Sequence, residues 1–197
     1  MNDLKINCKR IISKFFFAVA FSLFFIFFQT PSYAEDGFFE VNLAELREIN
    51  NTWLLDGRVA LDLSSEAVEA LRSGMMLSIQ MQFEITRQRM FWTDEKVKTS
   101  IRDFELRYMT LNQRYLVRNT ITGETQNFAT LSSALRSMGR IRDWQVIPEG
   151  IVKKDQQYNC GLRAVLNQDR LPGPIRLLAF WRGGFIIESD WYQWKLR

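Results

Sequence analysis

Residues 77–86 alternate strictly between apolar and polar side chains, and this pattern constrains the fold more than any other feature of the chain. The apolar members are Leu77, Ile79, Met81, Phe83 and Ile85. Because a β-strand points successive side chains to opposite faces, a period of two predicts a strand with one face in a core and the other toward solvent. We therefore expect these five side chains to be buried and Gln80, Gln82 and Glu84 to lie on the opposite face.

The same periodicity recurs along most of the chain after residue 38. Further strands are predicted at 39–43, 53–63, 104–108, 115–117, 125–128, 158–166, 175–181 and 185–194. Turn-forming pairs separate several of them, at Asn50-Asn51, Thr122-Gly123 and Gly183-Gly184. Eight or nine strands joined mostly by hairpins predict antiparallel sheets, each with one apolar face.

Two short helices interrupt the strands. Residues 66–73 follow Ser64 and Ser65, either of which can cap a helix N-terminus, and residues 131–138 follow Thr130, another capping residue. The predicted fold is mainly β: a two-layer antiparallel β-sandwich, immunoglobulin-like (Ig-like) in its general architecture, with two short helices.

The first 34 residues have the order of a secretory signal peptide. Four basic residues precede an apolar run over 15–28, which Pro31 and the small-x-small triplet 32–34 follow. We expect cleavage between Ala34 and Glu35, leaving residues 35–197 as a single β-sandwich domain. The alternative is an uncleaved membrane anchor, but a run of 14 residues is shorter than the ~20 that span a bilayer as a helix.

Removal of residues 1–34 changes the charge balance. Without the four basic residues and the one acidic residue of this segment, the 26 basic and 22 acidic residues of the chain fall to 22 and 21, a net charge of +1. A near-neutral chain gives no support for nucleic-acid binding. The sequence predicts an exported, periplasmic protein that meets the membrane only if the signal segment stays uncleaved.

The composition excludes several reaction types. The chain has no histidine, which removes the Ser-His-Asp, Cys-His and His-ligated metal mechanisms. Two carboxylate pairs, Asp94 with Glu95 and Glu188 with Asp190, are the visible acid–base candidates, and we expect both to be solvated surface. Cys160 alternates with apolar neighbours, so a buried inert thiol is expected there. The sequence therefore predicts no catalytic residue, no metal site and no cofactor.

The segment after the second helix carries the strongest candidates for a binding site. Arg140 and Arg142 flank Ile141 and are followed by Asp143 and Trp144. In an extended segment both guanidinium groups point away from the isoleucine, and two arginine forks can hold a carboxylate or phosphate of a partner. The alternative is structural: one arginine pairs with Asp143 or another acid while Trp144 fills the core.

Trp92 is a second candidate. It stands in the stretch 91–96, where an aromatic pair at a strand end precedes a charged turn. Exposed aromatic side chains there would mark a partner surface, whereas buried ones would close the end of the sandwich.

Several segments together resemble one known family. They are 92–97, 115–131, the Gly-Arg-Ile-Arg-Asp-Trp segment 139–144, and Ser189-x-Trp191-x-x-Trp194. Across residues 38–196 the chain is similar to the DUF4390 family of exported proteobacterial proteins, whose activity is not assigned. Its members are often encoded beside a nitrogen-type sensor kinase and its response regulator. The resemblance implies export and one domain, and it supplies no catalytic residues.

Two functions remain open at this point. The first is a non-enzymatic interaction module of the envelope, for which an envelope or inner-membrane protein, including a membrane sensor kinase, is the expected partner. The second is a small-ligand binder or a hydrolase-type enzyme that uses acids and arginines in a cleft.

Overall fold

The computed structural model describes residues 37–89, 93–153, 155–167 and 187–196. Contacts between residues divide the chain into two units, Met1–Tyr33 and Ala34–Arg197, and every described residue lies in the second. The predicted signal segment, its cleavage site at Ala34 and Glu35, and Trp92 lie outside the described residues. So do the predicted strand 175–181 and the Gly183-Gly184 turn.

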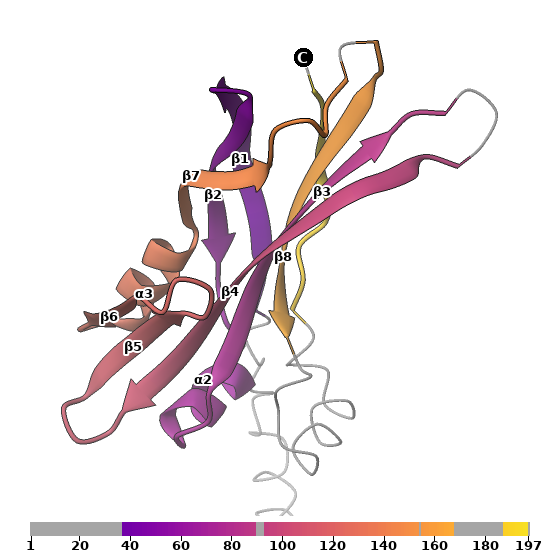
Figure 1. Cartoon of the computed structure of the whole chain (residues 1–197). Coiled ribbons are helices and arrows are strands. Elements are labelled where there is room, and N and C mark those ends of the chain that lie inside the picture. The colour runs from indigo at the N-terminus through magenta and orange to yellow at the C-terminus, as the bar shows by residue number, and fades with distance from the viewer. Residues whose placement is uncertain (1–36, 90–92, 154, 168–186, 197) are drawn as a thin grey trace, which may run out of the picture. The chain divides into compact units, whose positions relative to one another are not determined.

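Strands dominate the described part of the chain (Figure 1). The strands are β1 (Phe39–Ile49), β2 (Thr52–Leu61), β3 (Leu77–Arg87), β4 (Glu95–Met109), β5 (Arg114–Asn119), β6 (Thr125–Phe128), β7 (Arg140–Ile147), β8 (Tyr158–Asn167) and β9 (Tyr192–Lys195). The helices are α2 (Ser65–Arg72) and α3 (Leu131–Met138).

The strands form two antiparallel sheets. One has three strands in the order β1-β2-β7, and the other has six in the order β6-β5-β4-β3-β8-β9. Buried side chains from both sheets and both helices belong to one hydrophobic core. The predicted fold class, a mainly β sandwich with two short helices, is confirmed.

The alternating segment 77–86 becomes β3, the centre of the six-stranded sheet between β4 and β8. All five of its apolar side chains are at most 1% exposed. Gln80, Gln82 and Glu84 lie on the other face and are half-buried. This part of the prediction is confirmed, and burial of five large side chains contributes on the order of 1.5–3 kcal/mol each.

Both helices begin where the sequence predicts them. The Ser64 hydroxyl accepts the backbone N–H of Ala67 at 3.2 Å, and the Thr130 hydroxyl accepts that of Ser133 at 3.2 Å. These bonds satisfy two of the backbone donors that a helix N-terminus leaves unpaired. In the described ranges no helix is long and apolar enough to cross a membrane.

Two local expectations are wrong. The alternation of Phe39 and Val41 does not extend to Leu43, because β1 is irregular between Val41 and Leu43, and the Leu43 side chain is 42% exposed. The charged turn expected over 92–96 is shorter than predicted, because β4 already begins at Glu95, where it pairs with the last residue of β3.

Candidate functional site

The predicted arginine segment forms the start of β7, directly after α3. Ile141 points into the core with 2% of its surface exposed, whereas Arg140 and Arg142 are exposed. Side chains alternate across a strand, so burial of the isoleucine turns both arginines outward. The structure thus presents the two guanidinium groups on the same face of β7.

Gly139 fixes where this strand begins. Its carbonyl accepts the backbone N–H of Val59 at 2.8 Å, and its own N–H donates to Leu135 at 2.9 Å. A Cβ atom at this position would lie 2.1 Å from the carbonyl oxygen of Val59. Only glycine lets the end of α3 approach β2 this closely, and that approach places Arg140 one residue beyond the contact.

A bulge at Asp143 interrupts the alternation. Asp143 has a φ of 45°, and the pairing of β2 with β7 shifts register between Leu55 and Gly57. At this bulge the side chain of Asp56 accepts a hydrogen bond from the backbone N–H of Asp143 at 3.0 Å. Because of the extra residue, Asp143 is exposed and Trp144 turns inward to 7% exposure.

Arg47 on β1 connects the two carboxylates at this bulge. Its Nε donates to Asp56 Oδ2 at 2.6 Å and its Nη2 donates to Asp143 Oδ1 at 2.8 Å. The hydrogen bond from Arg47 lowers the pKa of Asp56 below its ordinary value, with smaller contributions from the Asp143 N–H and the charge of Arg142. Both carboxylates therefore already have a cationic partner in Arg47.

For Arg140 and Arg142 the structure bears only in part on the structural alternative, since the charge of Arg142 acts on Asp56 without a close ion pair. Asp143 pairs with Arg47, and within the described residues neither Arg140 nor Arg142 forms an ion pair or a side-chain hydrogen bond. The other half of that alternative is observed, because Trp144 does lie in the core. The segment thus combines a buried structural half with two arginines whose donors face solvent.

These two arginines line a cavity of ≈ 640 Å³ together with Arg102 and Arg136. The cavity lies between the β4-β5-β6 part of the large sheet and the α3–β7 segment. Its remaining lining side chains are Phe104, Val117, Asn119, Glu124, Gln126, Phe128, Ser133, Ser137 and Met138. Four guanidinium groups therefore face a single carboxylate, that of Glu124, so the cavity favours an anionic occupant.

Arg102 is the innermost of the four. On β4 it stands opposite the fully buried Met81 and shares the inward-facing side with Phe104 and Leu106. Its guanidinium carbon lies 4.9 Å from the centre of the Trp144 ring, and partial burial lowers its pKa from the usual arginine value. In the part of the chain that the structure describes, it has no ion pair with a carboxylate.

A second cavity of ≈ 880 Å³ lies on the β1–β2 side of the α3–β7 segment. Arg136, Arg140 and Arg142 line it as well, but here they are accompanied by three carboxylates, of Asp56, Asp62 and Asp143, and by Arg58. Four arginines therefore face three carboxylates in this cavity, whereas four face one in the first cavity. The predicted residues Arg140, Arg142 and Asp143 thus lie close to Arg136 on the α3–β7 segment. We call the exposed Arg136, Arg140 and Arg142 of this segment the arginine ridge.

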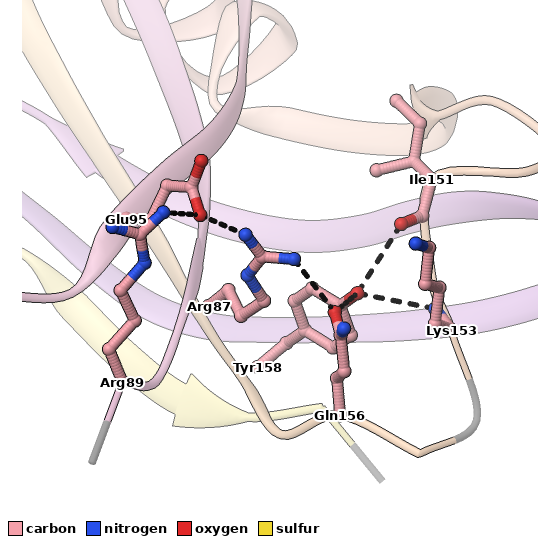
Figure 2. A network of polar contacts seen from close by, with 7 residues as sticks. All are labelled: Arg87, Arg89, Glu95, Ile151, Lys153, Gln156 and Tyr158. Carbon is pink, nitrogen blue, oxygen red and sulfur yellow. Dashed lines mark hydrogen bonds and ion pairs between the residues drawn. The ribbon is translucent and has the colours of Figure 1, made fainter.

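The described residues on either side of positions 90–92 in the sequence belong to a polar network (Figure 2). Glu95 accepts hydrogen bonds from Arg89 and Arg87, and Arg87 also donates to Gln156 at 3.1 Å. The Tyr158 hydroxyl in turn donates to Gln156 at 2.9 Å. These contacts hold the end of the β3–β4 hairpin against the loop before β8, and the two arginines lower the pKa of Glu95.

Of the other acid–base candidates, Asp94 and Glu188 are also engaged, and Asp190 is exposed. Asp94 accepts the side-chain amide of Asn159 at 3.3 Å, and Glu188 pairs with Arg163 at 3.5 Å. Burial raises the pKa of the Cys160 thiol to about 12, which keeps it protonated at neutral pH. Within the described ranges, no three acidic or cysteine side chains are grouped so as to hold a metal ion.

Sequence reasoning missed Arg102 and Arg136. For Arg102 a signal is present, since counting back in steps of two from the apolar Leu106 and Phe104 reaches an arginine on the inward side. For Arg136 the sequence offers only its place on α3, facing away from the buried Ala134, Leu135 and Met138. That these arginines share a cavity with β7 depends on how α3 packs beside β5 and β6 (Figure 1).

Comparison with known families gives one match. The profile of the family described as "Domain of unknown function (DUF4390)" matches residues 38–195 of the 197-residue chain. The matched range includes every helix and strand described above and both cavities. No curated protein and no solved structure is detectably similar to the chain.

Proposed function

The chain belongs to the DUF4390 family, and from this premise we propose that it is an exported, non-enzymatic interaction module that binds an acidic group of an envelope partner. The binding residues in this proposal are Arg140 and Arg142, on the ridge between the two cavities. The expected partner is an envelope or inner-membrane protein, and a membrane sensor kinase is the specific candidate.

The observation that carries this proposal is the presence of two exposed arginines on one face of a well-fixed strand that form no ion pair or side-chain hydrogen bond within the described residues. Guanidinium forks bind carboxylates and phosphates through paired, charge-assisted hydrogen bonds. Each such bond contributes up to about 1.5–3 kcal/mol where partner binding excludes water, so two arginines on a preorganised strand contribute part of the free energy of a specific interaction.

The immediate surroundings support a rigid presentation of these arginines. Asp56 and Arg47 hold the bulge on one side of Arg142, and the close contact of Gly139 with Val59 holds the strand start. Ordering of long side chains opposes binding, and a fixed backbone reduces that entropic cost. The arginine ridge therefore has the properties of a binding surface.

The proposed location depends on the amino-terminal 34 residues. Their basic, apolar and small-residue order supports export through a signal peptide with cleavage between Ala34 and Glu35. The mass of the intact protein isolated from the cell envelope tests this part. A mass equal to that of residues 35–197 supports cleavage, whereas a mass that includes Met1 favours a membrane anchor.

A ligand-binding function is the second candidate, and the ≈ 640 Å³ cavity favours it over a hydrolase-type enzyme. Asp56 and Glu95 have lowered pKa values because arginines bind them, so neither is suited to act as a general acid at neutral pH. The cavity itself is suited to binding an anion.

In-cell photocrosslinking tests the interaction proposal. A photoreactive residue replaces the exposed Gln145 on β7, and the captured envelope proteins are identified by mass spectrometry. The test variant combines Arg140→Ala with Arg142→Ala, and the matched control combines Arg72→Ala with Arg114→Ala, two exposed arginines that line neither cavity.

We expect one discrete partner to be captured by the unsubstituted ridge and by the control, and its yield to fall about tenfold or more in the test variant. Loss of two exposed arginines without ion pairs should cost at most about 0.5 kcal/mol of stability each. Undiminished capture by the test variant would refute the proposal. A melting temperature several degrees lower would show that the ridge is structural.

A further inference from the structure

The ≈ 640 Å³ cavity has features that a protein-docking ridge does not require. Its volume lies in the range of about 300–1,000 Å³ that is typical of small-molecule sites. Arg102 reaches it from the inward-facing side of β4, opposite the core residue Met81 and two residues from Phe104, which packs against the core. An arginine there is a poor choice for stability alone, since desolvation of its charge is costly.

The geometry of Arg102 indicates how it is held. The guanidinium carbon lies 4.9 Å from the centre of the Trp144 ring, and Trp144 is fixed in the core by its place on β7 opposite Leu55. Contact with the aromatic face leaves the N–H groups at the edge of the guanidinium available to a ligand. Trp144 is thus a positioning residue for Arg102.

In the lining of this cavity basic side chains outnumber acidic ones, although Arg136, Arg140 and Arg142 also face the carboxylates of the second cavity. Arg136 approaches from α3, and Arg140 and Arg142 from β7, while the lining contains the single carboxylate of Glu124. The Glu124 carboxylate accepts the side-chain amide of Gln126 at 2.6 Å, and none of the salt bridges in the described chain connects it to the four arginines. An anion with one charge would leave this cluster strongly cationic.

Part of the cavity lining is apolar, and we call this part the apolar wall. It consists of Phe104, Val117, Phe128 and Met138. Asn119, Gln126, Ser133 and Ser137 add neutral hydrogen-bonding groups to the lining. The combination fits a molecule with a multiply charged head and an apolar or ring-shaped body.

We propose that this cavity is a binding site for phosphate esters, with Arg102 and Arg136 binding the phosphate and the apolar wall contacting the body of the ester. A phosphate has more oxygen atoms and a higher charge than a carboxylate, so it can accept hydrogen bonds from several guanidinium groups at once. The site goes beyond the partner-binding function, since Arg102 is not part of the exposed ridge.

Isothermal titration of the full chain, purified in a neutral detergent, tests this site. The probe is phenyl phosphate, which combines a phosphate with a ring, and the comparison ligands are benzoate and inorganic phosphate. We expect phenyl phosphate to bind at least about tenfold more tightly than either, because benzoate lacks the phosphate and inorganic phosphate lacks the body. Equal or weaker binding than benzoate overturns the proposal.

Two variants locate the site. Arg102→Gln and Arg136→Gln should each weaken phenyl phosphate binding about tenfold or more, because each removes a charge-assisted contact. Arg114→Gln, an exposed arginine away from the cavity, serves as the control and should bind as the unsubstituted chain does. If Arg102→Gln does not fold, the exposed Arg136→Gln still decides, and unchanged binding in every folded variant overturns the assignment.

Two further comparisons separate the possible sources and functions. Tighter binding of the soluble lipid dihexanoyl phosphatidic acid than of phenyl phosphate indicates a lipid headgroup, and the reverse order indicates a soluble ester; either order supports the phosphate-ester site. Photocrosslinking from Gln145 is then repeated with Arg102→Gln, for which we expect unchanged partner capture. Failure of phenyl phosphate to bind overturns this inference but does not affect the proposed partner interaction. Loss of partner capture only in the Arg140 and Arg142 variant supports the proposed function and does not test the phosphate-ester site.

Discussion

Replacement of Gly139 by alanine should destabilise the junction of α3 and β7 that positions the arginine ridge. The backbone at this residue, with φ −73° and ψ −8°, suits alanine as well as glycine. The obstacle is space, because the new Cβ would lie 2.1 Å from the carbonyl oxygen of Val59, more than 1 Å closer than ordinary contacts allow. Relief of this clash requires β2 and α3 to separate.

Separation would break the hydrogen bond from the Val59 N–H to the Gly139 carbonyl, which is 2.8 Å long. A strained core contact costs about 1–3 kcal/mol, and a buried backbone donor left without its partner costs about 1–3 kcal/mol more. We therefore expect a loss of about 3 kcal/mol or more. For a chain of this length that corresponds to a melting temperature about 6–12 °C lower.

Gly123→Ala is the matched control. Gly123 has a φ of 74°, and nothing would lie within 4 Å of its new Cβ, so only the backbone preference is lost, at a cost of about 1 kcal/mol. Urea and thermal unfolding followed by tryptophan fluorescence measure both variants. If Gly139→Ala is no less stable than Gly123→Ala, the close approach to Val59 is not what fixes the start of β7.

Two further predictions concern ionisable groups. Arg47 lowers the pKa of Asp56 in the folded state, so the ionised Asp56 stabilises the folded protein. This contribution is fully present above the ordinary aspartate pKa of about 4 and is lost as the pH falls below it. The difference in unfolding free energy between the unsubstituted chain and Asp56→Asn should therefore shrink below about pH 4, and a constant difference in urea titrations would contradict this. In a Cys8→Ser background, Cys160 should react with Ellman's reagent only as fast as the protein unfolds, since burial raises the pKa of its thiol to about 12. The free energy of unfolding should also fall as the pH rises above about 8.5, the pKa of the thiol in the unfolded chain. Rapid labelling of the folded protein would contradict the burial of this thiol.

Local signals predicted the elements whose causes are local. Thr130 caps α3 through its own side chain, and Asn50 and Asn51 form the β1–β2 turn with φ values of 51° and 60°. Asparagine tolerates this backbone region better than most residues, so the turn could be predicted without knowledge of the sheet. The alternation of apolar and polar residues in β3 likewise predicts directly which of its side chains are buried in the core.

The irregularity in β1 could not be predicted in the same way. Leu43 continues the apolar alternation of Phe39 and Val41, yet its side chain is exposed because the strand shifts register against β2. At this position a Cβ on Gly57 would lie 2.8 Å from the Leu43 carbonyl oxygen. Gly57 signals a bend in its own strand, but which residue of the neighbouring strand it displaces depends on their pairing.

The beginning of β4 depends on cross-strand charge. Glu95 and Lys96 are polar neighbours that favour a turn when they are considered alone. In the structure Glu95 stands opposite Arg87 and also binds Arg89, while Lys96 binds Glu84 on β3 at 2.6 Å. Opposite charges across antiparallel strands stabilise their pairing, so the strand extends further than its composition indicates.

The candidate cavity shows the same limit for function. Three of its four arginines carry a local signal, since Arg102 has the parity of core residues on β4 and Arg140 and Arg142 alternate around Ile141. Their convergence, however, depends on α3 packing beside β5 and on β7 crossing toward β4, where the Ser100 hydroxyl donates to the Val146 carbonyl at 2.8 Å. The sequence separates these residues by about 40 positions, so no spacing rule connects them. A charged residue on the inward-facing side of a strand is therefore the sequence signal that best identifies such a site, and the fold then shows which other residues complete it.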